Sequence, residues 1–183
     1  RMTEVFLDVV DEEDKIIGKA LRSEIHAVGL RHREVHVWCI TPSGGVVFQR
    51  RAANKETFPN LLDATVGGHV ELGMSYEDAA LMEMREETGI SVPFDQLHFI
   101  GKKKSDAFDT VTQRHNKCFR VTYGFVLNTP VESLKIEDGQ ATGFVAVPVQ
   151  DILNPTPELF QQVISSLLKP ERHEMYLALA RLV

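Results

Sequence analysis

The sequence has few cysteines, no excess of positive charge and no long apolar run, and each absence excludes a class of protein. It contains 2 cysteines, Cys39 and Cys118, in 183 residues. They lie far apart in apolar runs, so their spacing predicts no zinc motif, and buried free thiols are the simplest interpretation. No apolar run approaches the roughly 20 residues that span a bilayer. We find neither an internal repeat nor a low-complexity tract, and we therefore expect a globular protein that does not enter a membrane.

The charge balance is acidic, with 26 Asp and Glu residues against 20 Lys and Arg residues and a formal net charge of −6. A protein that binds nucleic-acid polymers usually presents a basic face, so this balance argues against such a partner. A nucleotide-sized ligand needs only a small basic pocket and stays compatible with it. The first residues show no signal-peptide pattern, and we expect a cytoplasmic protein whose oligomeric state the sequence leaves open.

The hydrophobic pattern predicts one α+β domain over residues 2–183, with an N-terminal hairpin and short helix in residues 2–30. Strands are expected at residues 5–10, 16–20, 35–40, 46–50, 97–101, 119–126 and 143–147. Helices are expected at residues 22–28, 149–153, 157–168 and 177–183. The polar stretch 102–117 is either a hairpin arm or a mobile loop.

Three glutamates near the middle of the chain have helical spacing. Glu83, Glu86 and Glu87 lie at positions i, i+3 and i+4, which a helix of about 3.6 residues per turn places on one face. Exposed like charges so placed repel by roughly a few tenths of a kcal/mol per pair. A solvated surface is the common explanation, and a bound divalent cation is the alternative, because hard cations prefer carboxylate oxygens.

Residues around these glutamates predict where their helix begins and ends. Ser75 with Asp78 resembles a capping box, so a helix begins there, and Gly89 is a typical helix stop. Gly67 and Gly68 precede the segment and allow a tight turn or a close ligand approach. The segment is therefore predicted to form a glycine loop, a helix of about 13 residues and a glycine that ends the helix.

The run from Gly68 to Ile90 resembles the motif of the Nudix hydrolases. That motif reads Gly, five residues, Glu, seven residues, and then Arg-Glu-apolar-any-Glu-Glu-any-Gly-apolar. Two positions depart from it, since Met74 replaces the first Glu and Met82 replaces the Arg. The positions that match are Gly68, Glu83, Met84, Glu86, Glu87, Gly89 and Ile90.

The resemblance implies an α/β/α sandwich with a mixed, partly antiparallel sheet, and Mg²⁺- or Mn²⁺-dependent hydrolysis of a small diphosphate substrate. It implies Glu86 and Glu87 as metal ligands, Glu83 as a ligand or a base, and the carbonyl of Gly67 as a neutral ligand. In the family, the motif Arg orients the neighbouring Glu. Our hypothesis is that Met74 and Met82 replace this polar network by apolar packing and leave the ligands less well oriented.

The segment before the motif resembles the Nudix subgroup that is related to isopentenyl-diphosphate isomerase. In that subgroup the second Arg and the Lys of an Arg-Arg-Ala-any-any-Lys run contact diphosphate, which implies Arg51 and Lys55 here. Arg can hold phosphate through two parallel hydrogen bonds, and Lys adds a point charge. A solvated loop with scattered charges is the alternative for these residues.

Isomerase activity requires a cysteine in a Thr-Cys-Cys-Ser-His context, and the matching run here is Thr-Val-Gly-Gly-His at residues 65–69. Two alternatives to the hydrolase stay open. One is an isomerase-like enzyme, which the missing thiols argue against, and the other is a non-catalytic protein that binds a diphosphate ligand.

Some residues outside the motif keep open roles. A histidine matching His69 is a metal ligand in those isomerases, and His26 and His32 match further ligands only loosely in spacing. His36 alternates along a strand, and we expect it to be structural. Glu137 and Asp138 lie in the region from which a further carboxylate often assists the metal in Nudix enzymes, and Gln140 stands at the expected Glu position. A solvated turn is the favoured interpretation of this segment.

Overall fold

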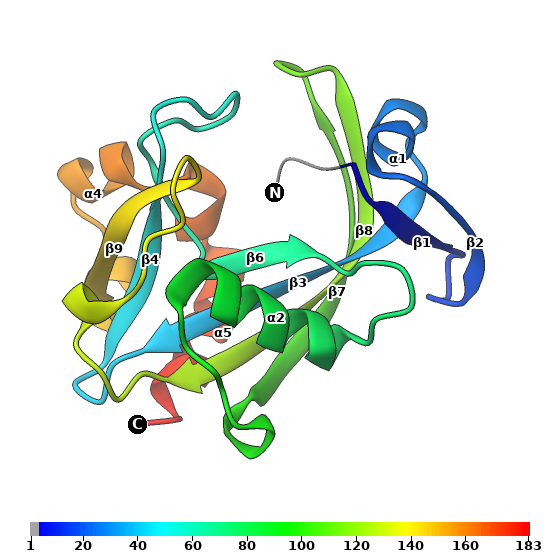
Figure 1. Ribbon diagram of the computed structural model, residues 1–183. Coiled ribbons are helices and arrows are strands. Elements are labelled where there is room, and N and C mark those ends of the chain that lie inside the picture. The colour runs from blue at the N-terminus through cyan, green and yellow to red at the C-terminus, as the bar shows by residue number, and fades with distance from the viewer. Residues whose placement is uncertain (1–3) are drawn as a thin grey trace.

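A mixed sheet with helices on both faces forms the centre of the molecule (Figure 1), in a computed structural model that describes residues 4–183. The predicted domain starts at residue 2, so its first two residues lie outside the described part. The strands are β1 (Phe6–Val10), β2 (Ile16–Leu21), β3 (Arg31–Ile40), β4 (Gly45–Arg51), β5 (Leu62–Asp63), β6 (Val66–His69), β7 (His98–Asp109), β8 (Arg114–Val126) and β9 (Ala141–Pro148). The α-helices are α1 (Arg22–Val28), α2 (Tyr76–Thr88), α3 (Val149–Leu153), α4 (Pro157–Gln162) and α5 (His173–Ala180). The α+β prediction is confirmed.

The sheet forks beside its central strand. β3 pairs in parallel with β8 on one side, and on the other side it pairs with β6 at Glu34–Val37 but with β4 only at Cys39 and Ile40. β4 then leaves β3 and pairs with β9. The Thr65 hydroxyl fastens the fork, because it accepts the Cys39 N–H at 2.9 Å and donates to the carbonyl of Val47. Because β4 and β6 diverge beside β3, polar side chains of all three strands can face the space between them.

Two apolar cores lie on opposite faces of the sheet. One contains Val35, Val37 and Cys39 of β3 and packs under α2. The other contains Trp38 and Tyr176, whose rings meet edge to face at 5.4 Å, and is covered by α3 and α5. Successive side chains of a strand point to opposite faces, so the alternation along β3 determines which core each residue joins.

The N-terminal unit of β1, β2 and α1 packs on the edge of this domain and has its own small core of Leu7, Val9, Ala20 and Ile25. Asp14, in its hairpin turn, accepts hydrogen bonds from Arg33 Nε at 2.7 Å and from the Tyr76 hydroxyl at 2.8 Å. Lys102 also pairs with this carboxylate. A single turn residue thus joins the N-terminal hairpin to β3, to the start of α2 and to β7.

The structure resolves one open prediction and corrects two others. Residues 102–117 form a hairpin arm, because β7 and β8 pair from His98–Gly124 out to Asp109–Arg114. The prediction of one continuous helix over residues 157–168 was wrong. α4 ends at Gln162, since Val163 is extended and forms a parallel bridge with Leu62, and a 3₁₀ turn follows at Ser165–Leu168. The last helix begins at His173 and ends at Ala180, not at residues 177–183.

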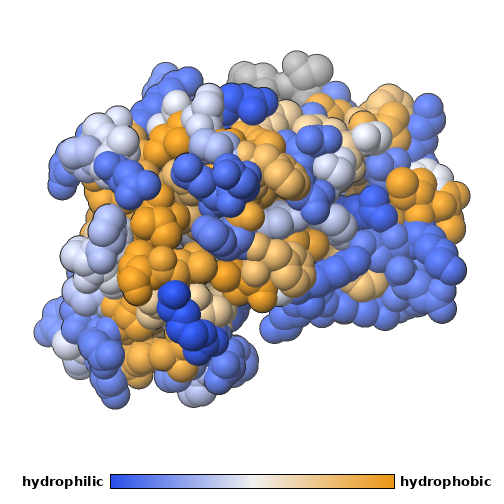
Figure 2. Space-filling model, turned by 90° about the horizontal axis from the view of Figure 1, so that it is seen from below, coloured by the Kyte–Doolittle hydropathy of each residue, from blue (hydrophilic) through white to orange (hydrophobic). Residues whose placement is uncertain are grey.

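Apolar side chains gather in patches on the lower face of the molecule, with polar side chains around and between them (Figure 2). The large exposed apolar residues of the described chain come from separate segments, such as Phe94, Phe99 and Leu177. Among residues 4–183, no helix combines the length and the apolar character needed to cross a membrane.

Candidate active site

The helix that carries the glutamates has the ends that the sequence predicts. The Asp78 N–H donates to Ser75 Oγ at 3.0 Å at the start of α2. Gly89 follows the helix with φ of 80°, a left-handed conformation that favours glycine, and its N–H bonds to the Arg85 carbonyl at 3.0 Å. α2 lies across β6 and β3 (Figure 1), so one of its faces is turned toward the fork of the sheet.

Glu83, Glu86 and Glu87 of α2 line one cavity of about 320 Å³. Glu83 and Glu87 are buried, and Glu86 is half-buried. Burial, together with the negative charge of Glu83, holds the pKa of Glu87 well above its usual range. Glutamates on a solvated helix face would be exposed, whereas Glu83 and Glu87 are buried. The solvated-surface interpretation is therefore wrong for these two residues.

The glycine pair of the motif lies directly against these carboxylates. The Gly67 N–H donates to Glu87 Oε2 at 3.3 Å. A β-carbon added to Gly68 would lie 2.5 Å from the carboxyl carbon of Glu83, so that carboxylate would have to move. Glycine at position 68 thus allows the Glu83 carboxylate to approach the backbone of β6 closely.

The two cations that the sequence predicts, Arg51 and Lys55, line the same cavity. Arg51, at the end of β4, is held by Asp63 Oδ2 at 3.1 Å and by the Thr57 carbonyl at 3.0 Å. Lys55, in the following loop, donates to Gln140 Oε1 at 2.5 Å. Burial, and then the positive charge of Arg51, lowers the pKa of Lys55. The tertiary structure thus brings the two predicted cations and the three predicted carboxylates to one place.

Further polar residues reach the cavity from distant parts of the chain. They are Arg22, Glu34, His36, Gln49, Asp63, His69, Glu71, Glu137 and Gln140. Glu137 and Gln140 are therefore not simply part of a solvated turn, whereas Asp138 beside them is exposed. Arg22 and Glu34 carry no local motif, and only their place in the fold reveals them.

The four histidines that the sequence singles out divide into two groups. His69 lines the cavity. Behind it lie His26 and His32, which are not among the lining residues, and nitrogen atoms of the three rings are within 4.8 Å of one another. Burial lowers the pKa of His69 to about 3, so its ring is neutral at ordinary pH. His36, which we expected to be structural, also lines the cavity, and its Nδ1 has no hydrogen-bond partner in the described chain.

Both cysteines are free and buried, as the sequence predicts. Burial raises the pKa of the Cys39 thiol to about 12. Neither cysteine belongs to the lining of the cavity within residues 4–183. The cavity therefore offers carboxylates, imidazoles, two amides and cations, which suit metal and phosphate binding better than thiol chemistry.

A protein-family model and several known proteins match this chain. A model of the NUDIX domain matches residues 30–167. An uncharacterized Nudix hydrolase of Clostridium acetobutylicum is 30% identical over 154 residues, which are 82% of this chain and 73% of that protein. One from Streptomyces coelicolor is 52% identical over 85 residues, and the alignment spans 46% of this chain and only 47% of that relative.

Solved structures show the same fold. A Deinococcus radiodurans protein matches with a TM-score of 0.64 and 23% identity, covering 89% of this chain and 96% of that one. The NUDIX domain of Shewanella oneidensis NrtR, solved with ADP ribose, matches with a TM-score of 0.56 and 17% identity over 82% and 87% of the two chains. The chain therefore belongs to the Nudix hydrolase family, and its cavity lies at the motif by which that family is recognised.

Proposed function

We propose that this protein hydrolyses a diphosphate bond in a small nucleoside-diphosphate-type substrate, with Mg²⁺ or Mn²⁺. The observation that carries the proposal is a single cavity lined by three helix glutamates and by Arg51 and Lys55. A diphosphate with a divalent cation is complementary to both sets, because its oxygens bind the cation and accept hydrogen bonds from Arg and Lys. The ADP ribose bound to the related NUDIX domain of NrtR belongs to this class of ligand.

The donor set fits a hard divalent cation. Glu86 and Glu87 would be ligands, Glu83 a ligand or a base, and the carbonyl of Gly67 a neutral ligand. Mg²⁺ keeps several waters and uses few protein carboxylates, so a helix face of glutamates suffices. The raised pKa of Glu87 supports this assignment, since burial and the charge of Glu83 disfavour its ionised form and a cation would offset both.

Bound metal would neutralise phosphate charge and activate a water molecule. Arg51 and Lys55 would hold the phosphate that does not react, with Arg51 oriented by Asp63 and Thr57. The water oxygen bonds to one phosphorus while the bond from that phosphorus to the bridging oxygen breaks. The water proton passes to a cavity carboxylate, for which Glu83 is the candidate, and the bridging oxygen leaves with the second phosphate.

A non-catalytic diphosphate-binding protein is the second candidate, because Met74 and Met82 replace the polar residues of the motif. Met74 packs against the core under α2, which supports apolar packing at that position. An isomerase is less well supported, since no thiol of the described chain lines the cavity.

The experiment is phosphate release with and without Mg²⁺ or Mn²⁺ across nucleoside di- and triphosphates, nucleotide sugars, dinucleotides and isoprenoid diphosphates. The double variant Glu86→Gln with Glu87→Gln is expected to lose metal-dependent turnover and keep its fold, as circular dichroism and thermal melting would show. Glu132→Gln with Glu158→Gln is a matched control, because both glutamates are exposed and lie outside the cavity lining.

Metal-dependent turnover that only the α2 variant loses would establish the hydrolase and its substrate class. Saturable binding of a diphosphate without turnover would support the binding protein instead. Incorporation of solvent deuterium into isopentenyl diphosphate would point to the isomerase and overturn the hydrolase.

A further inference from the structure

A second cavity, of about 350 Å³, lies where α5 and the turn before it pack against β7 and β8. No residue that lines it also lines the first cavity. Its volume is in the lower part of the usual range for ligand pockets, about 300–1,000 Å³, and suits a small ligand. The wall combines apolar groups, a hydroxyl and charged side chains, from Ile100, Met175, Ala178, Thr122, Lys102, Lys103, Glu171, Arg172, Glu174 and Arg181.

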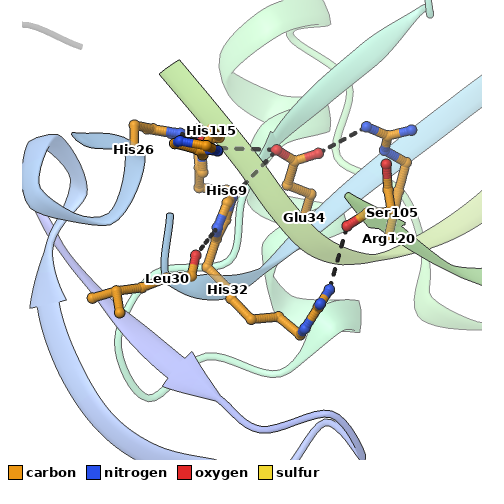
Figure 3. Close-up of polar contacts among 9 residues, drawn as sticks. His26, Leu30, His32, Glu34, His69, Ser105, His115 and Arg120 are labelled. Carbon is orange, nitrogen blue, oxygen red and sulfur yellow. Dashed lines mark hydrogen bonds and ion pairs between the residues drawn. The ribbon is translucent and has the colours of Figure 1, made fainter. Parts of the chain in front are cut away.

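Two cations of the sheet lie side by side at this cavity. Lys103 of β7 is directly opposite Arg120 of β8, and opposed residues of two strands share one face of the sheet. Like charges in this position destabilise a sheet. Glu34 of β3, the next residue across the sheet, accepts a hydrogen bond from Arg120 at 3.0 Å (Figure 3), and its other oxygen lies 3.4 Å from His32 Nε2. Glu34 thus compensates Arg120, whereas Lys103 has no ion pair within residues 4–183.

Arg172, in the turn before α5, brings a further positive charge to the same place. Its side chain is half-buried, and its guanidinium has neither a hydrogen bond nor an ion pair in the described part of the chain. Burial, and then the positive charge of Arg120, lowers the pKa of Arg172. Because an arginine stays protonated in a protein, this charge is retained in unfavourable surroundings. A bound anion would offset both the burial and the repulsion from Arg120.

The carboxylates at the second cavity do not neutralise its cations by direct contact. Glu171 and Glu174 are exposed, and among residues 4–183 neither forms an ion pair. Lys102 is already compensated, because its side chain pairs with Asp14. The other three cations of the lining are therefore available to a ligand, namely Lys103, Arg172 and Arg181.

We propose that the second cavity binds a small organic phosphate, a phosphate monoester whose organic part is apolar. Arg172 would hold the phosphate through two parallel hydrogen bonds, and Lys103 and Arg181 would add positive charge. The Thr122 hydroxyl would donate a further hydrogen bond. The organic part would contact the apolar wall, which consists of Ile100, Met175 and Ala178. The proposal does not rest on the proposed hydrolysis, since the two cavities share no lining residue.

The test is a calorimetric titration of the full chain with phenyl phosphate, in EDTA to keep divalent metal out of the first cavity. Arg172→Met should weaken binding about 10–100-fold, because it removes charged hydrogen bonds to the phosphate. Arg181→Met changes an exposed side chain and should weaken binding about 2–5-fold. The control Lys169→Met removes an exposed cation outside the lining and should leave the affinity unchanged. Phenol, which lacks the phosphate, should not bind saturably.

A second readout separates this site from the first cavity. In NMR spectra, phenyl phosphate should shift the amide signals of Gly101 and Thr122 more than that of Gly67. Lys55→Met removes a cation of the first cavity and should leave these shifts unchanged. Because neither measurement needs turnover, a failure of the hydrolysis assay would not alter them. The proposal would be overturned by the absence of saturable binding, by an affinity that Arg172→Met leaves unchanged, or by shifts centred on Gly67.

Discussion

The backbone N–H of Gly67 on β6 donates a hydrogen bond to Oε2 of Glu87 on α2, across 3.3 Å. This bond joins the glycine segment to the helix that carries the proposed metal ligands. An N–H donor favours the ionised carboxylate, but it is outweighed here, since burial and the charge of Glu83 hold the pKa of Glu87 well above its usual range. Metal-free protein therefore holds a proton at Glu87 under conditions where an exposed glutamate is ionised.

That proton would make the proposed Mg²⁺ binding dependent on pH. The folded pKa of Glu87 is raised, so its contribution to stability is present below the unfolded value of about 4.3 and is lost as pH rises through the folded value. Without metal, stability should fall over that window, and Mg²⁺ should restore it. We also expect Mg²⁺ affinity to weaken as pH falls through the same window, because the proton and the cation compete.

Calorimetric titration of Mg²⁺ in two buffers of different ionisation enthalpy would count the protons released on binding. Release should be measurable in the wild type and absent in Glu87→Gln. Equal heats in both buffers for the wild-type protein would contradict the assignment of Glu87 as a protonated ligand.

Gly68→Ala tests the close approach of the Glu83 carboxylate to β6. The added β-carbon would lie 2.5 Å from that carboxyl carbon, so Glu83 must move. We expect turnover to fall about 10–100-fold, as for other losses of ligand or base orientation. Gly101→Ala is the matched control, since a β-carbon there meets no atom within 4 Å. Equal activity of the two variants would show that the position of Glu83 is unimportant.

Lys55→Met tests the proposed phosphate contact. A hydrogen bond to a charged group is worth about 1.5–3 kcal/mol, so KM for the substrate should rise about 10–100-fold. The exposed Lys169→Met, which removes the same charge away from the cavity, should leave KM unchanged. A fall in kcat at constant KM would instead place Lys55 in the chemical step.

Met82→Arg with Met74→Glu tests whether the two departures from the motif weaken the enzyme. Restoring the polar network should raise kcat/KM about 10–100-fold. Met74→Glu alone should lower the free energy of unfolding by about 1–3 kcal/mol, because Met74 packs against the core under α2. Urea denaturation would measure this loss. The gain should vanish in the Glu86→Gln/Glu87→Gln background, and no gain in the wild-type background would contradict the hypothesis.

The elements whose signals are local were predictable from the sequence. α2 runs from Tyr76 to Thr88 because Ser75 caps it and Gly89 ends it, and both signals lie within a few residues of the ends. The same holds for α1 and for the alternating faces of β3. The elements that were predicted wrongly depend on contacts between distant segments of the chain. The bridge between Val163 and Leu62 breaks the helix expected over residues 157–168, and no local pattern reveals it.

The candidate site divides in the same way. The spacing of Glu83, Glu86 and Glu87 by itself determined that their carboxylates share one helix face, because helical periodicity is a local property of the chain. Only the tertiary structure decided that Arg51 and Lys55 reach this face, and that Glu34 meets His26, His32 and His69. Those meetings depend on the fork of β3, β4 and β6 and on the packing of α1, which pair residues far apart in the sequence.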